Sequence, residues 1–86
     1  MSYDTVAFVL WEDPMTHSGE WVSKDVALAL KGAPSLTVGV LVSADKYYIR
    51  LALDVNKDGE ANGVGVIPMR CVTEIKLVPI PKGFRL

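Results

Sequence analysis

The sequence holds very little cysteine and histidine, with one of each, Cys71 and His17, among 86 residues. A single cysteine excludes an intramolecular disulfide and favours a reduced, intracellular setting. A zinc site needs more cysteine and histidine than the chain holds. The sequence also lacks charge of one sign, since 9 Lys and Arg stand against 10 Asp and Glu, a net charge of −1. Overall charge therefore cannot drive nucleic-acid binding, which would need a local site.

Long apolar runs are missing as well. The longest near the start, Val6 to Trp11, is far too short to span a membrane. Asp4 stands where a signal peptide needs a basic residue, so we expect a cytoplasmic protein with no membrane partner. The length predicts one domain over residues 1–86. Half of the residues are apolar, which is high for so small a chain and favours burial against another subunit.

The first part of the chain predicts one strand followed by an insertion. Residues 5–11, TVAFVLW, are β-branched and aromatic, which predicts a strand buried on both faces. Residues 12–22 contain Pro, Ser and Gly and predict a loop. Ser23 is placed to cap a short helix over residues 24–31, KDVALALK. Apolar residues also alternate in this segment, which leaves a strand open.

The rest of the chain predicts a meander of strands. Residues 36–44 and 47–55 form a hairpin that turns at Asp45-Lys46. Side chains alternate between two faces along its second strand. The apolar face carries Tyr47, Ile49, Leu51, Leu53 and Val55. The more polar face carries Tyr48, Arg50, Ala52 and Asp54. A short strand over 64–69 contains Pro68, which implies a sheet edge or a strand end, and a last strand covers 71–78.

Five strands joined mostly by short turns predict a mainly β protein. Closing such a sheet removes most exposed edges, so we expect a small five-stranded SH3-like or OB-like barrel. A short helix or irregular insertion follows its first strand.

The stretch DVNKDGE, residues 54–60, fits the opening of a calcium-binding EF-hand loop. The twelfth loop position, which should carry a bidentate Glu, is Gly65, and the flanking segments predict strands rather than helices. We therefore expect a polar loop between two strands, with no metal and no cofactor.

The predicted hairpin, GVLVSADKYYIRLAL, resembles the first motif of the Sm and Sm-like family, which includes LSm and Hfq proteins. The residues at the motif's spacings are Gly39, Leu41, Ser43, Asp45 and Tyr47. Residues 66–78, VIPMRCVTEIKLV, resemble the second motif of the same family, with Arg70-Cys71 before the last apolar strand. Where the family usually places an Asn that reads a base edge, this chain has Ile49. Trp-x-Asp and Ile-Pro near the two ends also resemble small phage-encoded barrel proteins, which implies a phage origin in an infected host.

The resemblance implies a Sm-like barrel that forms a homo-oligomeric ring and binds single-stranded RNA or DNA. It implies that Tyr47 stacks on a base, that Arg70 pairs with phosphate or stacks, and that Lys46 adds a phosphate contact. The implied nucleic-acid-binding residues are Asp45, Lys46, Tyr47, Arg70 and Cys71. Two structural roles stay open: Tyr47 in the core, and Arg70 paired with Glu74 or with a neighbouring subunit.

An enzyme is not expected, because no acid–base or nucleophile arrangement can be assembled. His17 lies beside Ser18 in a polar loop, and neighbouring residues seldom converge into a catalytic site. The alternative function is a structural or adaptor module that makes protein contacts through Trp11 to Leu30. Packing against the barrel is the expected role of Trp11 and Trp21.

Overall fold

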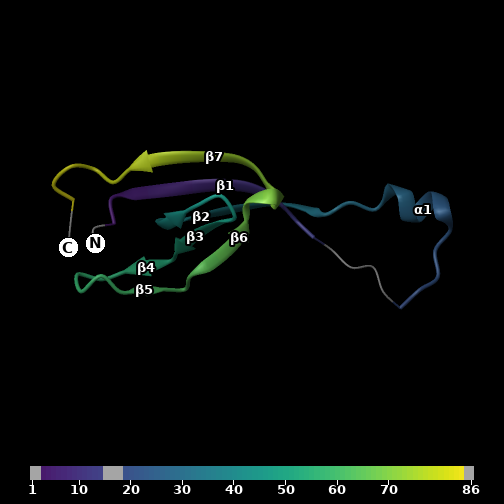
Figure 1. The fold of residues 1–86 in the computed structure, drawn as a ribbon, viewed down its shortest axis with the longest axis horizontal. Coiled ribbons are helices and arrows are strands. Elements are labelled where there is room, and N and C mark those ends of the chain that lie inside the picture. The colour runs from purple at the N-terminus through teal and green to yellow at the C-terminus, as the bar shows by residue number, and fades with distance from the viewer. Residues whose placement is uncertain (1–2, 15–18, 85–86) are drawn as a thin grey trace.

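The computed structural model describes residues 3–14 and 19–84. They form a five-stranded antiparallel sheet in the order β6-β3-β2-β1-β7 (Figure 1). Its strands are β1 (Thr5–Asp13), β2 (Ala33–Ala44), β3 (Tyr48–Ala52), β6 (Gly65–Pro68) and β7 (Val72–Pro79). The remaining elements are α1 (Lys24–Ala29), the hairpin strands β4 (Asp54–Val55) and β5 (Ala61–Asn62), and the 3-10 turn η1 (Met69–Cys71). The predicted mainly β class is confirmed.

One face of the sheet carries the core. The fully or almost fully buried core side chains are Ala7, Val9, Ile49, Leu51 and Ile67. Half-buried residues pack against them from β1, β2, η1 and β7: Trp11, Leu41, Met69, Val72 and Ile75. All five strands therefore contribute to one apolar cluster, which requires the sheet to curve around it.

The other face of β1 is exposed, so the prediction that this strand is buried on both faces is wrong. Phe8 is 40% and Leu10 is 43% exposed, although they alternate with the buried Ala7 and Val9. A β-branched and aromatic run does not distinguish a strand covered on both faces from one covered on a single face. This strand is of the second kind.

The two edges of the sheet are β6 and β7, which η1 joins along the chain. Pro68 ends β6, in keeping with the predicted edge position. Within residues 3–14 and 19–84 the two edge strands are not hydrogen-bonded to each other, so the sheet is open. The closed barrel stays a prediction.

The hairpin of β2 and β3 confirms the predicted turn, and it confirms the two faces of the second strand over residues 48–51 only. Ala52, predicted on the polar face, is buried, and Leu53, predicted on the apolar face, is 73% exposed, because the strand breaks there. Ile49 and Leu51 point into the core, whereas Arg50 lies on the opposite face and bonds to Ser43. The second strand is shorter than predicted: it starts after Tyr47 and breaks at Leu53, before β4 begins. The last strand likewise begins at Val72 rather than at residue 71. Residue 71 belongs to the 3-10 turn η1, which connects β6 to β7.

Residues 19–31 form an arm that projects from the sheet (Figure 1). The hydroxyl oxygen of Ser23 accepts a hydrogen bond from the backbone N–H of Val26 at 3.3 Å, which caps α1 as predicted. Since residues 24–29 are helical, the strand alternative for this segment is wrong. The arm makes the molecule elongated, with extents of 57 × 22 × 21 Å. No helix in the described part of the chain is long and apolar enough to cross a membrane.

Candidate nucleic-acid interface

The β2–β3 turn is built around the carboxylate of Asp45. Its Oδ1 accepts hydrogen bonds from the backbone N–H groups of Tyr47 and Tyr48 at 2.8 and 2.9 Å. The Asp45 N–H donates to the carbonyl of Tyr48 at 2.9 Å and closes the turn. Asp is favoured in turns because its side chain can satisfy the N–H groups that follow it.

The other oxygen of Asp45 pairs with Arg50. The distance from Arg50 Nη1 to Asp45 Oδ2 is 3.2 Å, and the same nitrogen lies 3.2 Å from the Ser43 hydroxyl. Hydrogen bonds from the N–H of Tyr47, then of Tyr48, then from Arg50, lower the pKa of Asp45 from its ordinary value of 3.8. Both oxygens serve the turn, so Asp45 positions the neighbouring aromatic residues rather than presenting a free acceptor.

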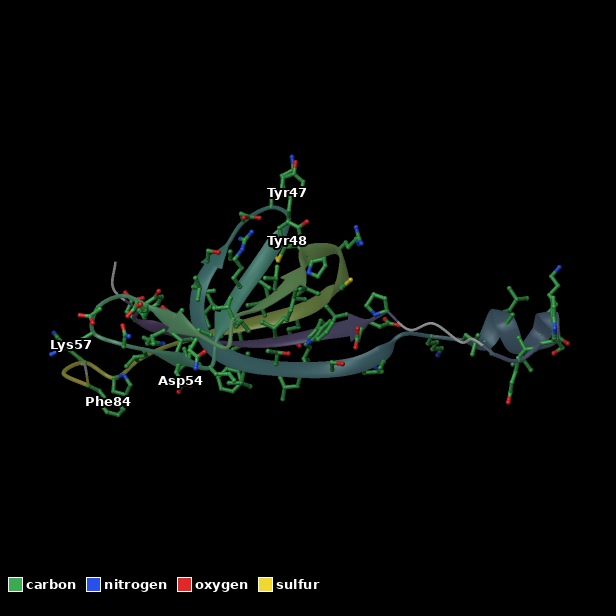
Figure 2. The ribbon with its side chains drawn as sticks, turned by 90° about the horizontal axis from the view of Figure 1, so that it is seen from below. Tyr47, Tyr48, Asp54, Lys57 and Phe84 are labelled. Carbon is green, nitrogen blue, oxygen red and sulfur yellow. The ribbon has the colours of Figure 1, made fainter. Side chains whose placement is uncertain are left out.

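The turn exposes two tyrosine rings next to cations (Figure 2). Tyr47 is 64% exposed, so the alternative in which it belongs to the core is wrong. Lys46 Nζ lies 5.3 Å from the centroid of the Tyr47 ring, and Arg50 Cζ lies 5.3 Å from that of Tyr48. These are cation–π distances, and both rings keep surface open to solvent.

Arg70 reaches the same place from another part of the chain. The N–H of Met69 donates to the carbonyl of Tyr47 at 2.8 Å, which ties η1 to the turn. A shallow hollow of about 170 Å³ is lined by Lys46, Tyr47, Tyr48, Pro68 and Arg70. We call this hollow the tyrosine site.

The predicted residues meet only in part. Lys46, Tyr47 and Arg70 come together, and Asp45 supports them, whereas Cys71 is half-buried and does not line the hollow. The alternative pairing of Arg70 with Glu74 is wrong, because Arg50–Asp45 is the only ion pair within residues 3–14 and 19–84.

Pro68 lines the hollow although it was not among the predicted site residues. The sequence prediction also missed Tyr48, which lines the hollow, and Arg50, which lies over the Tyr48 ring. The alternation of the strand already placed them together on the more polar face, which was the available signal. The position where the family carries a base-reading Asn is the fully buried Ile49, which offers no polar group. The tyrosine site therefore presents rings and cations, without an amide to read a base edge.

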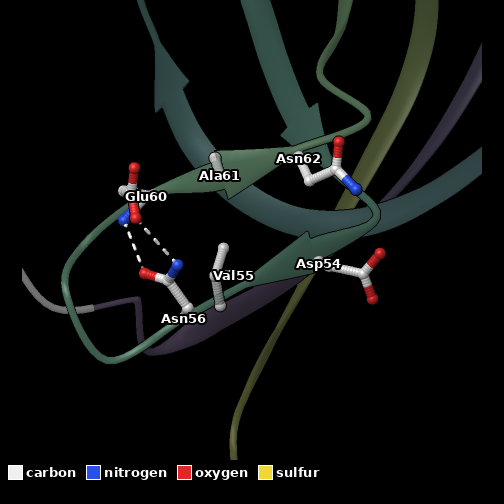
Figure 3. Close-up of a pocket in the computed structure, with 6 residues that line it drawn as sticks. All are labelled: Asp54, Val55, Asn56, Glu60, Ala61 and Asn62. Carbon is white, nitrogen blue, oxygen red and sulfur yellow. Dashed lines mark hydrogen bonds between the residues drawn. The ribbon is translucent and has the colours of Figure 1, made fainter.

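The acidic stretch is a hairpin loop, as predicted (Figure 3). Asn56 Oδ1 accepts from the N–H groups of Asp58 and Glu60 at 3.0 Å each, and Asn56 Nδ2 donates to Glu60 Oε1 at 3.1 Å. Gly59 has a φ of +82°, the left-handed conformation that glycine adopts without strain. Among the residues that the structure describes, no three His, Cys, Asp or Glu side chains gather in a metal-binding group.

The two tryptophans differ. Trp11 packs against the core, and its indole Nε1 donates to Thr37 Oγ1 at 2.9 Å, which confirms its predicted packing role. Trp21 is fully exposed, so the same prediction is wrong for it. His17 and Ser18 lie outside the described residues.

Comparisons with family models, curated proteins and solved structures gave no match to this chain.

Proposed function

We propose that this protein is a Sm-like, ring-forming small barrel that binds single-stranded RNA or DNA at the tyrosine site. The observation that carries the proposal is the convergence of Lys46, Tyr47 and Tyr48 with Arg70, from two separate segments, around one hollow. The resemblance of Tyr47 and Arg70 to positions in the Sm-like motifs also supports it.

The chemistry of the tyrosine site suits an unpaired strand. An exposed ring gives a base a stacking surface worth about 1–3 kcal/mol per base, whichever base it is. Lys46 and Arg70 supply positive charge for phosphates, in a protein whose net charge is −1. With Ile49 buried, we expect binding with little base preference.

The open edges of the sheet support the assembly. β6 and β7 are the edge strands, and among residues 3–14 and 19–84 neither has a partner strand on its outer side, so their backbone groups can hydrogen-bond to the edge of another subunit. Pairing of β6 of one subunit with β7 of the next would extend the sheet from subunit to subunit and close the assembly into a ring. A ring repeats the tyrosine site around one axis, so modest single contacts add up by multivalency.

Fluorescence anisotropy with uridine-rich and adenine-rich oligonucleotides at low salt tests the binding. We expect Tyr47→Ala to raise the Kd by about 5- to 150-fold, the equivalent of one lost stacking contact. Phe84→Ala is the matched control, since Phe84 is also an exposed ring but lies away from the turn (Figure 2). Absence of binding by the unaltered protein, or equal losses in the two variants, would refute the nucleic-acid role.

A salt titration of the same binding tests the charge contribution. Each phosphate neutralised on a single strand adds about 0.7 to the slope of log K against log salt. We expect Arg70→Gln to lower that slope by about 0.7. Lys57→Gln, on the hairpin far from Tyr47 (Figure 2), should leave it unchanged. Unequal Kd values with equal slopes would assign Arg70 to stacking instead.

The second candidate is a non-enzymatic adaptor that binds protein through the arm. The observation that favours it is the exposure of Trp21 and of every residue of α1. Capture from a host lysate separates the two candidates: only nuclease-sensitive material supports nucleic-acid binding, and a nuclease-resistant protein supports the adaptor.

A further inference from the structure

The folded chain exposes more surface than its mass predicts. Its accessible surface is 6887 Å², whereas a folded monomer of this mass exposes about 5,000 Å². Its radius of gyration is 16.8 Å, against about 12 Å for a compact domain of this length. The surplus of roughly 1,900 Å² compares with about 800 Å² that each partner buries in a standard protein interface.

Part of the surplus lies on the arm, defined as residues 19–31. None of these residues is buried. Its large exposed apolar side chains are Trp21, Val22, Val26, Leu28 and Leu30. A six-residue helix gains little stability by itself, since isolated helices shorter than about 12–15 residues are marginal in water. Contact with another apolar surface would stabilise it.

A second exposed apolar surface lies on the outer face of β1 and β2. We call it the outer patch: Phe8, Leu10, Leu36 and Val38, which are paired across the strands as Phe8 with Val38 and Leu10 with Leu36. A hollow of about 220 Å³ crosses it and is bordered by Glu74 and Lys76 of β7. The patch is apolar at its centre and charged at its rim, which is the usual anatomy of an interface.

The arm of one chain lies away from its own patch. The β1–β2 pairing continues to Asp13 and Ala33, and the N–H of Gly32 donates to Glu12 Oε1 at 3.0 Å. A Cβ at position 32 would lie 2.7 Å from Glu12 Cγ and 2.8 Å from the Asp13 carbonyl oxygen, so the base of the arm is closely packed. This base directs the arm outward along the strands (Figure 1).

We infer that the arm of each subunit docks on the outer patch of a second copy of this chain. One chain holds both unpartnered apolar surfaces, and the surplus area is enough for each subunit to give one arm and receive one. The net charge of −1 opposes the approach of two copies only weakly. The inference rests on the self-association in the proposed function and adds, beside the pairing of strand edges, a second contact that the assembly needs in order to persist.

Size-exclusion chromatography with light scattering tests the inference on the full chain. We expect Trp21→Ser with Leu28→Ser to lower the molar mass at least twofold, and Leu36→Asp on the patch to do the same. Phe84→Ser is the control for Leu28→Ser, since both side chains are 74% exposed, and it should keep the mass. Far-UV circular dichroism checks that each variant is folded.

Mixing the arm variant with the patch variant gives the decisive result. The arm variant has an intact patch and the patch variant an intact arm, so the mixture should regain a complex heavier than either alone. If both variants have a lower molar mass and their mixture does not regain it, the arm covers a surface other than the patch. That result overturns the inference. An unchanged mass in the arm variant would overturn it too, and would point to a different protein or to no partner.

Trp21 fluorescence tests docking in the unaltered protein. Emission should shift to longer wavelength on dilution, as the docked indole returns to water, and an emission that is independent of concentration would contradict docking. Oligonucleotide binding is a separate measurement, so a monomer that still binds nucleic acid refutes the arm contact alone. An assembly that restores itself by mixing but binds no oligonucleotide refutes the nucleic-acid role alone.

Discussion

Asp45 determines the shape of the tyrosine site although its own oxygens are already used. Its carboxylate accepts from two successive N–H groups and from Arg50, and so fixes the backbone that carries Tyr47 and Tyr48. A pattern of Asp followed two residues later by an aromatic therefore has a structural explanation here. The acid orients the ring, and the proposed function assigns ligand contact to the ring and its neighbouring cations.

The charge of Asp45 should make the stability of the turn depend on pH. Its pKa is lower in the folded chain than the ordinary value of 3.8, so the carboxylate stabilises the fold above that pH. The contribution is lost as the pH falls through the lower folded value. We expect Asp45→Asn to reduce Tm at pH 7, with a difference from the unaltered protein that shrinks below pH 4 in thermal melts.

Asp58→Asn is the matched control for that series. Asp58 is exposed, and its carboxylate makes no hydrogen bond to the rest of the described chain. Its Tm difference should be small at every pH. A difference for Asp45→Asn that stays constant from pH 7 to pH 2.5 would mean that geometry, and not charge, explains the effect.

Residues of the tyrosine site could be predicted from the sequence only where they belong to the segments that resemble the Sm-like motifs. Lys46 and Tyr47 are adjacent, and the family resemblance added Arg70. Tyr48 and Arg50 were visible as residues of one strand face, but their part in the site depends on how the hairpin bends at the bulge between Leu41 and Ser43. The alternation of apolar and polar residues along a strand predicts its two faces, but it does not predict how the hairpin bends.

Among the elements, the β2–β3 hairpin was the most predictable. Its Asp turn predicts the reversal of the chain, and its alternating residues predict the two faces of the second strand as far as Leu51. The capped helix was also predictable, because Ser23 followed by an acidic residue is a local signal. The one-sided burial of β1 was not, since it depends on what packs against the strand rather than on the strand itself.

The β4–β5 hairpin depends on the left-handed conformation of Gly59. Its φ is +82°, and its carbonyl accepts from the Tyr3 hydroxyl at 2.8 Å. A Cβ there would meet no atom within 4 Å, so Gly59→Ala isolates the backbone cost, about 1–2 kcal/mol for an L residue. We expect the free energy of unfolding in urea to fall by about that amount.

Gly65→Ala provides the comparison within the same region. Its added Cβ would also meet nothing within 4 Å, but its φ is not positive. This variant should be neutral or slightly more stable, because alanine reduces the entropy of the unfolded chain. Equal losses in the two variants would show that a methyl group, and not the sign of φ, destabilises the region.

At the scale of the whole molecule, the small core is the reason to expect self-association. Only six hydrophobic residues are buried among those described, and the molecule is more than twice as long as it is wide. A domain of this size buries only about 60% of its unfolded surface, so its stability alone is marginal. The composition is rich in apolar residues, and the fold leaves many of these residues exposed, so the two observations agree.

If assembly supplies part of the stability, Tm must depend on protein concentration. Binding of the native state by a partner at 100 times its Kd adds about 2.7 kcal/mol, and 1 kcal/mol moves the Tm of a domain this size by roughly 4–8 °C. We expect calorimetry to show Tm rising by roughly 10–20 °C over a 100-fold increase in concentration. The variant with Trp21→Ser and Leu28→Ser should lose much of this rise while keeping the low-concentration Tm, because α1 contributes no buried residue to the monomer. A Tm that is constant over the whole range would mean that the monomer is stable by itself, and the exposed surfaces would then need another explanation.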